Sequence, residues 1–93
     1  MIQTFKCKET KKIFHRRFSL KLPQDIQRNA MKKLWMLDAT PDIQSLRVPP
    51  SNHLEALKGN QEGQYSIRIN RQWRICFNWE TGNAFDVEIV DYH

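Results

Sequence analysis

The sequence predicts an α+β domain: a small antiparallel sheet from the C-terminal half, with two N-terminal helices packed on one face. Two patterns predict this class. Between residues 23 and 37, apolar side chains recur every three or four positions, as they do along one face of a helix. Between residues 64 and 79, apolar and polar side chains alternate, as in strands with one buried face. Helices that precede a run of hairpin strands are typical of an α+β arrangement.

The first 22 residues predict two short elements and a connector. Partial alternation in residues 2–6 indicates a first strand. Residues 10–17 place Ile13 and Phe14 among lysines and arginines, which predicts a short amphipathic helix with a basic exposed side. Residues 19–22 then connect this helix to the next one.

The second helix has the strongest pattern in the chain. Pro23 suits its first turn, where the missing N–H costs nothing, and Pro41 disfavours helical geometry in the residue before it. Basic residues outside the apolar stripe are expected on a solvated face. The stripe consists of Ile26, Ala30, Leu34 and Leu37, widened by Met31 and Trp35, and the basic residues outside it are Arg28, Lys32 and Lys33.

The segment after this helix predicts a linker without regular structure. Residues 48–52 include two adjacent prolines and are expected to be extended and stiff. Before and within this linker, Ile43, Leu46 and Val48 are expected to form a small apolar lid.

Residues 53–93 are expected to form three or four antiparallel strands, one of them at residues 57–59, and their register follows from keeping the apolar residues on one side. A short loop at residues 70–72 would place Arg68 opposite Arg74. A turn at residues 80–84 would bring three apolar residues of the last strand to the buried face: Phe85, Val87 and Ile89. The opposite, polar face would then hold Arg68, Arg74 and Tyr92, with Asp91 and His93 at its rim.

Length and composition indicate one soluble domain, residues 1–93, in the cytoplasm. No apolar run approaches the roughly 20 residues needed to cross a bilayer, and residues 1–6 lack the apolar core of a secretory signal. Cys7 and Cys76 have no metal-ligand spacing and imply no disulfide, so we expect no metal site and no cofactor. The formal net charge of +5 favours an anionic partner such as nucleic acid.

The predicted polar face carries the groups that RNA cleavage without a metal requires. The reaction takes a proton from the 2′-hydroxyl, stabilises charge on the phosphate, and returns a proton to the leaving 5′-oxygen. An arginine opposite an arginine is also repelled across the sheet, and a bound anion would relieve this. The cations are Lys58, Arg68, Arg71 and Arg74, and the groups able to move protons are His53, Glu55, Asp91, Tyr92 and His93.

Several segments resemble the HigB toxins of bacterial toxin–antitoxin systems, which belong to the RelE/ParE superfamily. The resemblance rests on residues 54–59, 63–70, 73–77 and 87–93, and extends over nearly the whole chain. It implies a RelE-like fold similar to microbial RNases, and a ribosome-dependent endonuclease that cuts mRNA in the decoding site. It also implies a partner antitoxin, the helix-turn-helix protein HigA. By this resemblance Asp91, Tyr92 and His93 match the family's C-terminal active-site cluster, Arg74 its strand arginine and Lys58 its lysine before glycine.

One position departs from the family pattern. Where some members have a catalytic histidine three residues before the lysine, this chain has Glu55, and His53 lies two residues further upstream. Either residue is a candidate general base. Two other functions stay open at this point: inhibition of DNA gyrase, as in ParE-like proteins of the same fold, and binding of RNA or ribosomes without turnover.

Overall fold

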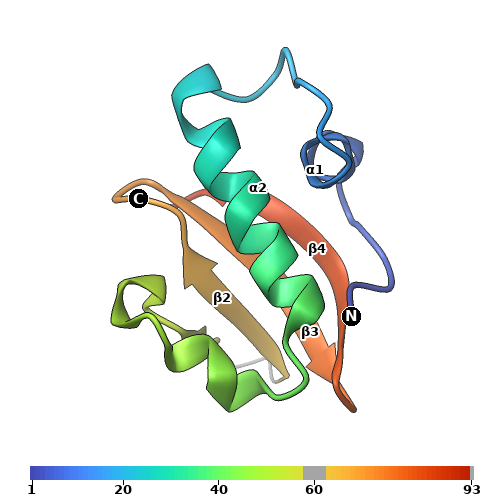
Figure 1. The fold of residues 1–93 in the computed structure, drawn as a ribbon, viewed down its shortest axis with the longest axis vertical. Coiled ribbons are helices and arrows are strands. Elements are labelled where there is room, and N and C mark those ends of the chain that lie inside the picture. The colour runs from blue at the N-terminus through green and yellow to red at the C-terminus, as the bar shows by residue number, and fades with distance from the viewer. Residues whose placement is uncertain (58–62, 93) are drawn as a thin grey trace.

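The computed structural model describes residues 1–57 and 63–92 and has two layers, helices over an antiparallel sheet (Figure 1). The predicted α+β class is confirmed. The sheet has the strand order β1-β2-β3-β4, so each strand pairs with its neighbour in the chain. The helices are α1 (Lys8–Phe14) and α2 (Gln24–Ala39), followed by the 3-10 turns η1 (Ile43–Arg47) and η2 (Pro50–Asn52). The strands are β1 (Glu55–Ala56), β2 (Gln64–Arg68), β3 (Trp73–Glu80) and β4 (Asn83–Asp91).

Helix α2 lies across the sheet and forms most of the core with it (Figure 1). The predicted stripe is confirmed, because all four of its residues are buried, and each Ile or Leu side chain buried in this way contributes about 1.5 to 3 kcal/mol. On the sheet, Ile67, Ile75, Val87 and Ile89 are buried beneath it. In the part of the chain that the structure describes, neither α1 nor α2 covers the other sheet face, and we call it the open face (Figure 1).

The prediction that Lys33 lies on the solvated face of α2 is wrong, since this side chain is only 8% exposed. Its ammonium donates a hydrogen bond to Oδ1 of Asn52, which is fully buried in η2 and itself donates to the Leu46 carbonyl at 3.0 Å. This network fixes η2 against α2. The predicted extended linker is therefore wrong at residues 50–52, and the lid is only partly formed, because Leu46 is buried whereas Val48 is 72% exposed.

The N-terminal segment is not a full strand. Ile2 and Phe5 form isolated parallel bridges to Ala84 and Val87 of β4, so residues 2–6 follow the edge of the sheet without continuous pairing. The backbone N–H of Ile2 donates instead to Asp38 of α2 at 2.9 Å. The strand expected at residues 57–59 also differs: β1 ends at Ala56, and residues 58 and 59 are outside the described part of the chain.

The β3–β4 hairpin is tighter than predicted and contains a bulge. Its turn is Thr81–Gly82, both with positive φ, as a two-residue type I′ turn requires. Cys76 pairs with Glu88 and Asn78 with Phe85, so β4 has one extra residue in this interval, and Asp86 there has a φ of 52°. The bulge reverses the alternation. Ala84, rather than Phe85, is fully buried, and the expectation for Phe85 is wrong.

Candidate active site

Arg74, near the start of β3, belongs to the open face, and its guanidinium is held by protein groups. The pairing of Arg68 with Arg74 is confirmed, but Arg74 is only 7% exposed. Its Nε donates to Ser66 Oγ at 2.9 Å, and its Nη2 donates to the His53 carbonyl at 2.5 Å. Its Nη1 is 3.8 Å from Glu55 Oε1. We call Arg74, Ser66, His53, Glu55 and Tyr92 the arginine site.

Tyr92 covers the arginine site from the C-terminal end of β4. Its ring centroid lies 5.5 Å from Arg74 Cζ, a cation–π distance, and the side chain is 43% exposed. The Tyr92 N–H donates to the Gln72 carbonyl at 2.6 Å, which positions the backbone of the tail. A phenol that is fixed beside a cation and also reaches solvent can stack on a base or take part in proton transfer.

His53 and Glu55 both belong to the arginine site, in different ways. His53 follows η2 with a left-handed φ of 44°, which aims its carbonyl at Arg74. Glu55 pairs with Ser66 across β1 and β2, and its carboxylate approaches Arg74 directly. Both residues are exposed. The structure therefore brings both residues to Arg74, Glu55 by its side-chain carboxylate and His53 by its backbone carbonyl.

The other predicted residues of the C-terminal cluster are placed differently. Asp91 is opposite Trp73, so it alternates with Tyr92 and belongs to the opposite side of β4. Its Oδ2 accepts a hydrogen bond from Gln72 Nε2 at 3.1 Å. His93 and Lys58 are outside the described residues.

Arg68 and Arg71 line a hollow of about 430 Å³ between α2, η2 and the loop after β2. Arg68 Nε donates to the Asn70 carbonyl at 3.0 Å, so the two paired arginines turn to different partners. We call this hollow the basic pocket. It is lined by Asn29, Lys33, Ser51, His53, Arg68, Ile69, Asn70 and Arg71. Sequence reasoning missed Asn29, Lys33 and Ser51; the only signal was a lysine next to the apolar stripe.

Cys76 is also on the open face, close to Glu88. Burial raises the pKa of its thiol, and the Glu88 carboxylate adds to this, so the sulfur is protonated at neutral pH and is a poor nucleophile. Within residues 1–57 and 63–92, no three His, Cys, Asp or Glu side chains gather as metal ligands would.

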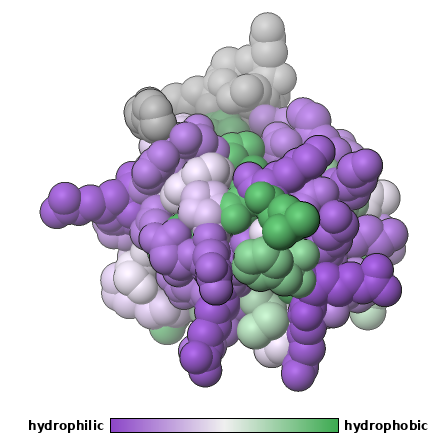
Figure 2. All heavy atoms as spheres, turned by 90° about the horizontal axis from the view of Figure 1, so that it is seen from above, coloured by the Kyte–Doolittle hydropathy of each residue, from purple (hydrophilic) through white to green (hydrophobic). Residues whose placement is uncertain are grey.

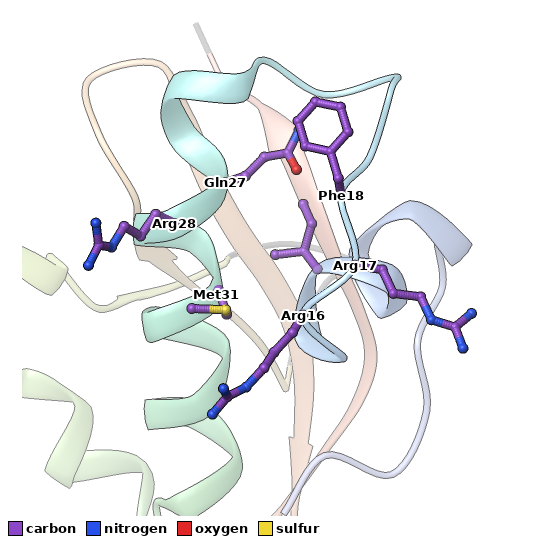
Figure 3. A pocket seen from close by; sticks show the side chains of 7 residues that line it. Arg16, Arg17, Phe18, Gln27, Arg28 and Met31 are labelled. Carbon is purple, nitrogen blue, oxygen red and sulfur yellow. The ribbon is translucent and has the colours of Figure 1, made fainter.

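Another hollow, of about 360 Å³, lies between α1 and α2 and is apolar (Figure 3). Phe18, one of its lining residues, is exposed, and Figure 2 shows apolar surface at this end of the molecule, surrounded by hydrophilic side chains. In Figure 3, Arg17 and Arg28 point away from it on opposite sides. We call it the apolar groove, lined by Ile13, Arg16, Arg17, Phe18, Gln27, Arg28 and Met31. It has no carboxylate or imidazole, so it lacks the groups for acid–base chemistry.

The comparisons with known proteins identify the family. Residues 3–93 match the family described as the RelE-like toxin HigB of type II toxin–antitoxin systems. The chain belongs to this family. Toxin HigB-1 of Vibrio cholerae is 42% identical over 65 residues, which are 70% of this chain and 68% of that protein. Endoribonuclease HigB of Proteus vulgaris is 34% identical over 94 residues, covering 100% of both chains.

Solved structures support the RelE-like fold. A YafQ variant from E. coli superposes with a TM-score of 0.65 at 11% identity, over 98% of this chain and 91% of that one. YoeB in a complex with YefM from Staphylococcus aureus gives a TM-score of 0.58 at 22% identity, over 100% and 95%. At these identities the likeness concerns the fold alone. No helix among the described residues is long and apolar enough to span a membrane.

Proposed function

We propose that this HigB-family toxin is an endoribonuclease that cleaves mRNA in the decoding site of translating ribosomes. The name of the Proteus vulgaris relative, which aligns over its full length, supports the activity. The observation that carries the proposal is the contact of Tyr92 with Arg74 beside the Glu55 carboxylate. A buried cation beside an exposed phenol and an exposed carboxylate supplies the groups that phosphodiester cleavage needs, whereas a gyrase inhibitor or a binding module needs no proton-transfer groups there.

The proposed reaction is attack by the neighbouring 2′-hydroxyl. A base takes the hydroxyl proton, the O2′–P bond forms as the P–O5′ bond breaks, and the 5′-oxygen gains a proton. The products are a 2′,3′-cyclic phosphate and a 5′-hydroxyl. We assign Glu55 as the first candidate base and His53 as the second, with Asp91 and His93 as candidates for returning the proton.

Arg74 and Tyr92 take the electrostatic and positioning roles in this scheme. The bonds of Arg74 to Ser66 and His53 fix its guanidinium before substrate arrives, so little reorganisation is needed when charge develops on the phosphate. Tyr92 would stack on a base and hold the strand in line. Lys58, Arg68 and Arg71 would bind the RNA backbone.

We further propose that the partner is a HigA-like helix-turn-helix antitoxin, and that the toxin acts in the cytoplasm, where translation takes place. The family is defined by toxin–antitoxin systems, which supports an antitoxin as partner. A complex isolated after coexpression of the two proteins, with cleavage suppressed, is the expected result.

The test is cleavage of a defined mRNA on purified, programmed ribosomes, with the ends of the products analysed. We expect cuts inside the reading frame, 2′,3′-cyclic or 3′-phosphate ends, and little cleavage of the same RNA without ribosomes. Tyr92→Ala should be slower than Tyr92→Phe, because the phenylalanine retains a stacking ring. Arg28→Ala, on the exposed side of α2, is the matched control. Intact mRNA together with trapped gyrase–DNA breaks in cells would favour the ParE-like function, and 3′-hydroxyl ends would exclude the proposed mechanism.

A further inference from the structure

The basic pocket contains a concentration of positive charge without a carboxylate. Of its eight lining residues, three are lysine or arginine, one is histidine, and none is aspartate or glutamate. Among the described residues, neither Arg68 nor Arg71 forms an ion pair, whereas Arg74 faces Glu55. The pocket therefore attracts an anion that the protein itself does not supply.

Lys33 strengthens this charge from the floor of the pocket. Burial lowers the pKa of its ammonium, and the acceptor it contacts, Asn52 Oδ1, is a neutral amide oxygen. An ammonium that is desolvated and paired only with a neutral group is stabilised when an anion binds beside it. An anion in the pocket would offset the free-energy cost of desolvating the Lys33 ammonium.

The walls of the pocket are held by hydrogen bonds among its own residues. Asn29 donates to the Ile69 carbonyl at 2.8 Å, which ties α2 to the end of β2. Asn70 Oδ1 accepts from the backbone of Gln72 and Trp73, both at 2.8 Å, which closes the loop that carries Arg71. The backbone that carries these donors is thus held in the free protein, and binding requires little ordering of the main chain.

His53 connects this pocket to the arginine site. Its carbonyl accepts from Arg74, while the residue also lines the basic pocket. The hollow of about 430 Å³ is within the range of small-molecule sites. We propose that the basic pocket binds a backbone phosphate of the single-stranded RNA, next to the segment held at the arginine site. This inference rests on the proposed function and adds Asn29, Lys33 and Ser51 to the RNA-binding surface.

The first test measures binding alone. A fluorescent, fully 2′-O-methylated oligonucleotide cannot undergo 2′-hydroxyl attack, so its anisotropy reports affinity without cleavage. We compare the wild-type chain with Arg71→Gln, and use Arg28→Gln as an exposed control of the same type. Arg71→Gln should weaken binding about 3- to 10-fold and reduce the slope of log affinity against log salt by about 0.7, the value for one lost phosphate contact to a single strand. Lys33→Met should also weaken binding, provided that its circular dichroism is unchanged.

The second test uses inorganic phosphate as the probe. In NMR titrations, resonances of Asn29, Asn70 and Arg71 should shift in the wild-type chain and not in Arg71→Gln. If Arg71→Gln and Arg28→Gln bind the oligonucleotide equally, the pocket is not an RNA site, even where cleavage on ribosomes is intact. If an acidic peptide binds through Arg71 and the oligonucleotide does not, the occupant is a protein and the proposal is wrong. Pocket-dependent binding without any cleavage would contradict the proposed function and leave the pocket assignment standing.

Discussion

The arginine site contains Arg74 and the basic pocket contains Arg68, and these two paired arginines differ in burial and in hydrogen bonding. The two residues are directly opposite on neighbouring strands, with the same chemistry and the same side of the sheet. Arg74 is buried and bonded to Ser66 and His53, whereas Arg68 makes one hydrogen bond, to the Asn70 carbonyl, and lines a hollow. Acceptors that distant segments bring to the sheet thus decide whether a strand arginine supports the fold or is available to a ligand.

The expected repulsion between these arginines is reduced because their side chains are directed to different acceptors. The guanidinium of Arg74 is directed to acceptors on its own side, including Glu55, and Arg68 is directed to the loop after β2. Like charges on opposed strands cost at most about 1 kcal/mol, which these separate contacts can offset. Because Arg68 is directed to this loop, an anion that it binds is expected in the basic pocket, beside the arginine site.

The largest expected effect comes from ending the chain at Val90. Removing residues 91–93 takes the Tyr92 ring from the arginine site and removes the two candidate proton donors, Asp91 and His93, while every residue that lines the basic pocket stays in the chain. We expect cleavage on ribosomes to fall by about 10²- to 10⁴-fold, as for lost general acid–base groups. Oligonucleotide affinity should change much less. Full activity in a folded truncated chain would show that the tail has no part in the chemistry.

Arg74→Ala should lower the free energy of unfolding by about 2 to 4 kcal/mol, because it leaves a buried acceptor on Ser66 and a partly buried one on His53 without their donor. Arg68→Ala, at the paired position, should change it by less than about 1 kcal/mol. Urea denaturation of both variants measures the difference. Equal stability of the two variants would contradict the comparison between the sites. A loss of cleavage in Arg74→Ala alone would not establish a catalytic role, because the variant is also destabilised.

Ser66→Ala removes one acceptor from Arg74 and keeps the strand. Hydrogen bonds to charged groups contribute roughly 1.5 to 3 kcal/mol, and the Ser66 carbonyl still faces Nη2 at 3.4 Å, so we expect a loss of about 1.5 kcal/mol. Ser51→Ala, in the exposed wall of the basic pocket, is the control and should stay within about 0.5 kcal/mol of wild type. A Ser66→Ala variant as stable as this control would mean that the serine contributes little to holding Arg74.

The smallest effect concerns a contribution of Glu9, in α1, to stability in acid. The hydrogen bond from the Ser19 hydroxyl at 2.6 Å, and then Lys12, hold the pKa of Glu9 below its ordinary value of 4.5. Between the folded and unfolded pKa values the unfolded chain binds more protons, so this contribution is complete above about pH 4.5 and is lost as the pH falls. Thermal unfolding of Glu9→Gln from pH 6 to pH 3 should show a shallower decline than wild type. An identical decline would place the acid-sensitive group elsewhere.

Sequence reasoning predicted much of the fold and part of the candidate site. The stripe of α2, the pairing of Arg68 with Arg74 and the position of Tyr92 beside Arg74 are all confirmed. It did not predict that Arg74 is buried, nor that Lys33 leaves the solvated face. It also misplaced Phe85, because alternation alone does not reveal a bulge.

Features that depend on local spacing can be read from the sequence. Helical and strand periodicities involve neighbouring residues, and a short loop at residues 70–72 fixes the register of the strands it joins. Tertiary structure alone decided the state of the charged groups. The Lys33–Asn52 bond joins residues 19 apart and the Arg74–His53 bond residues 21 apart. The free energy of a buried charge depends on acceptors that folding brings from such distances, and no periodic pattern records where those acceptors lie.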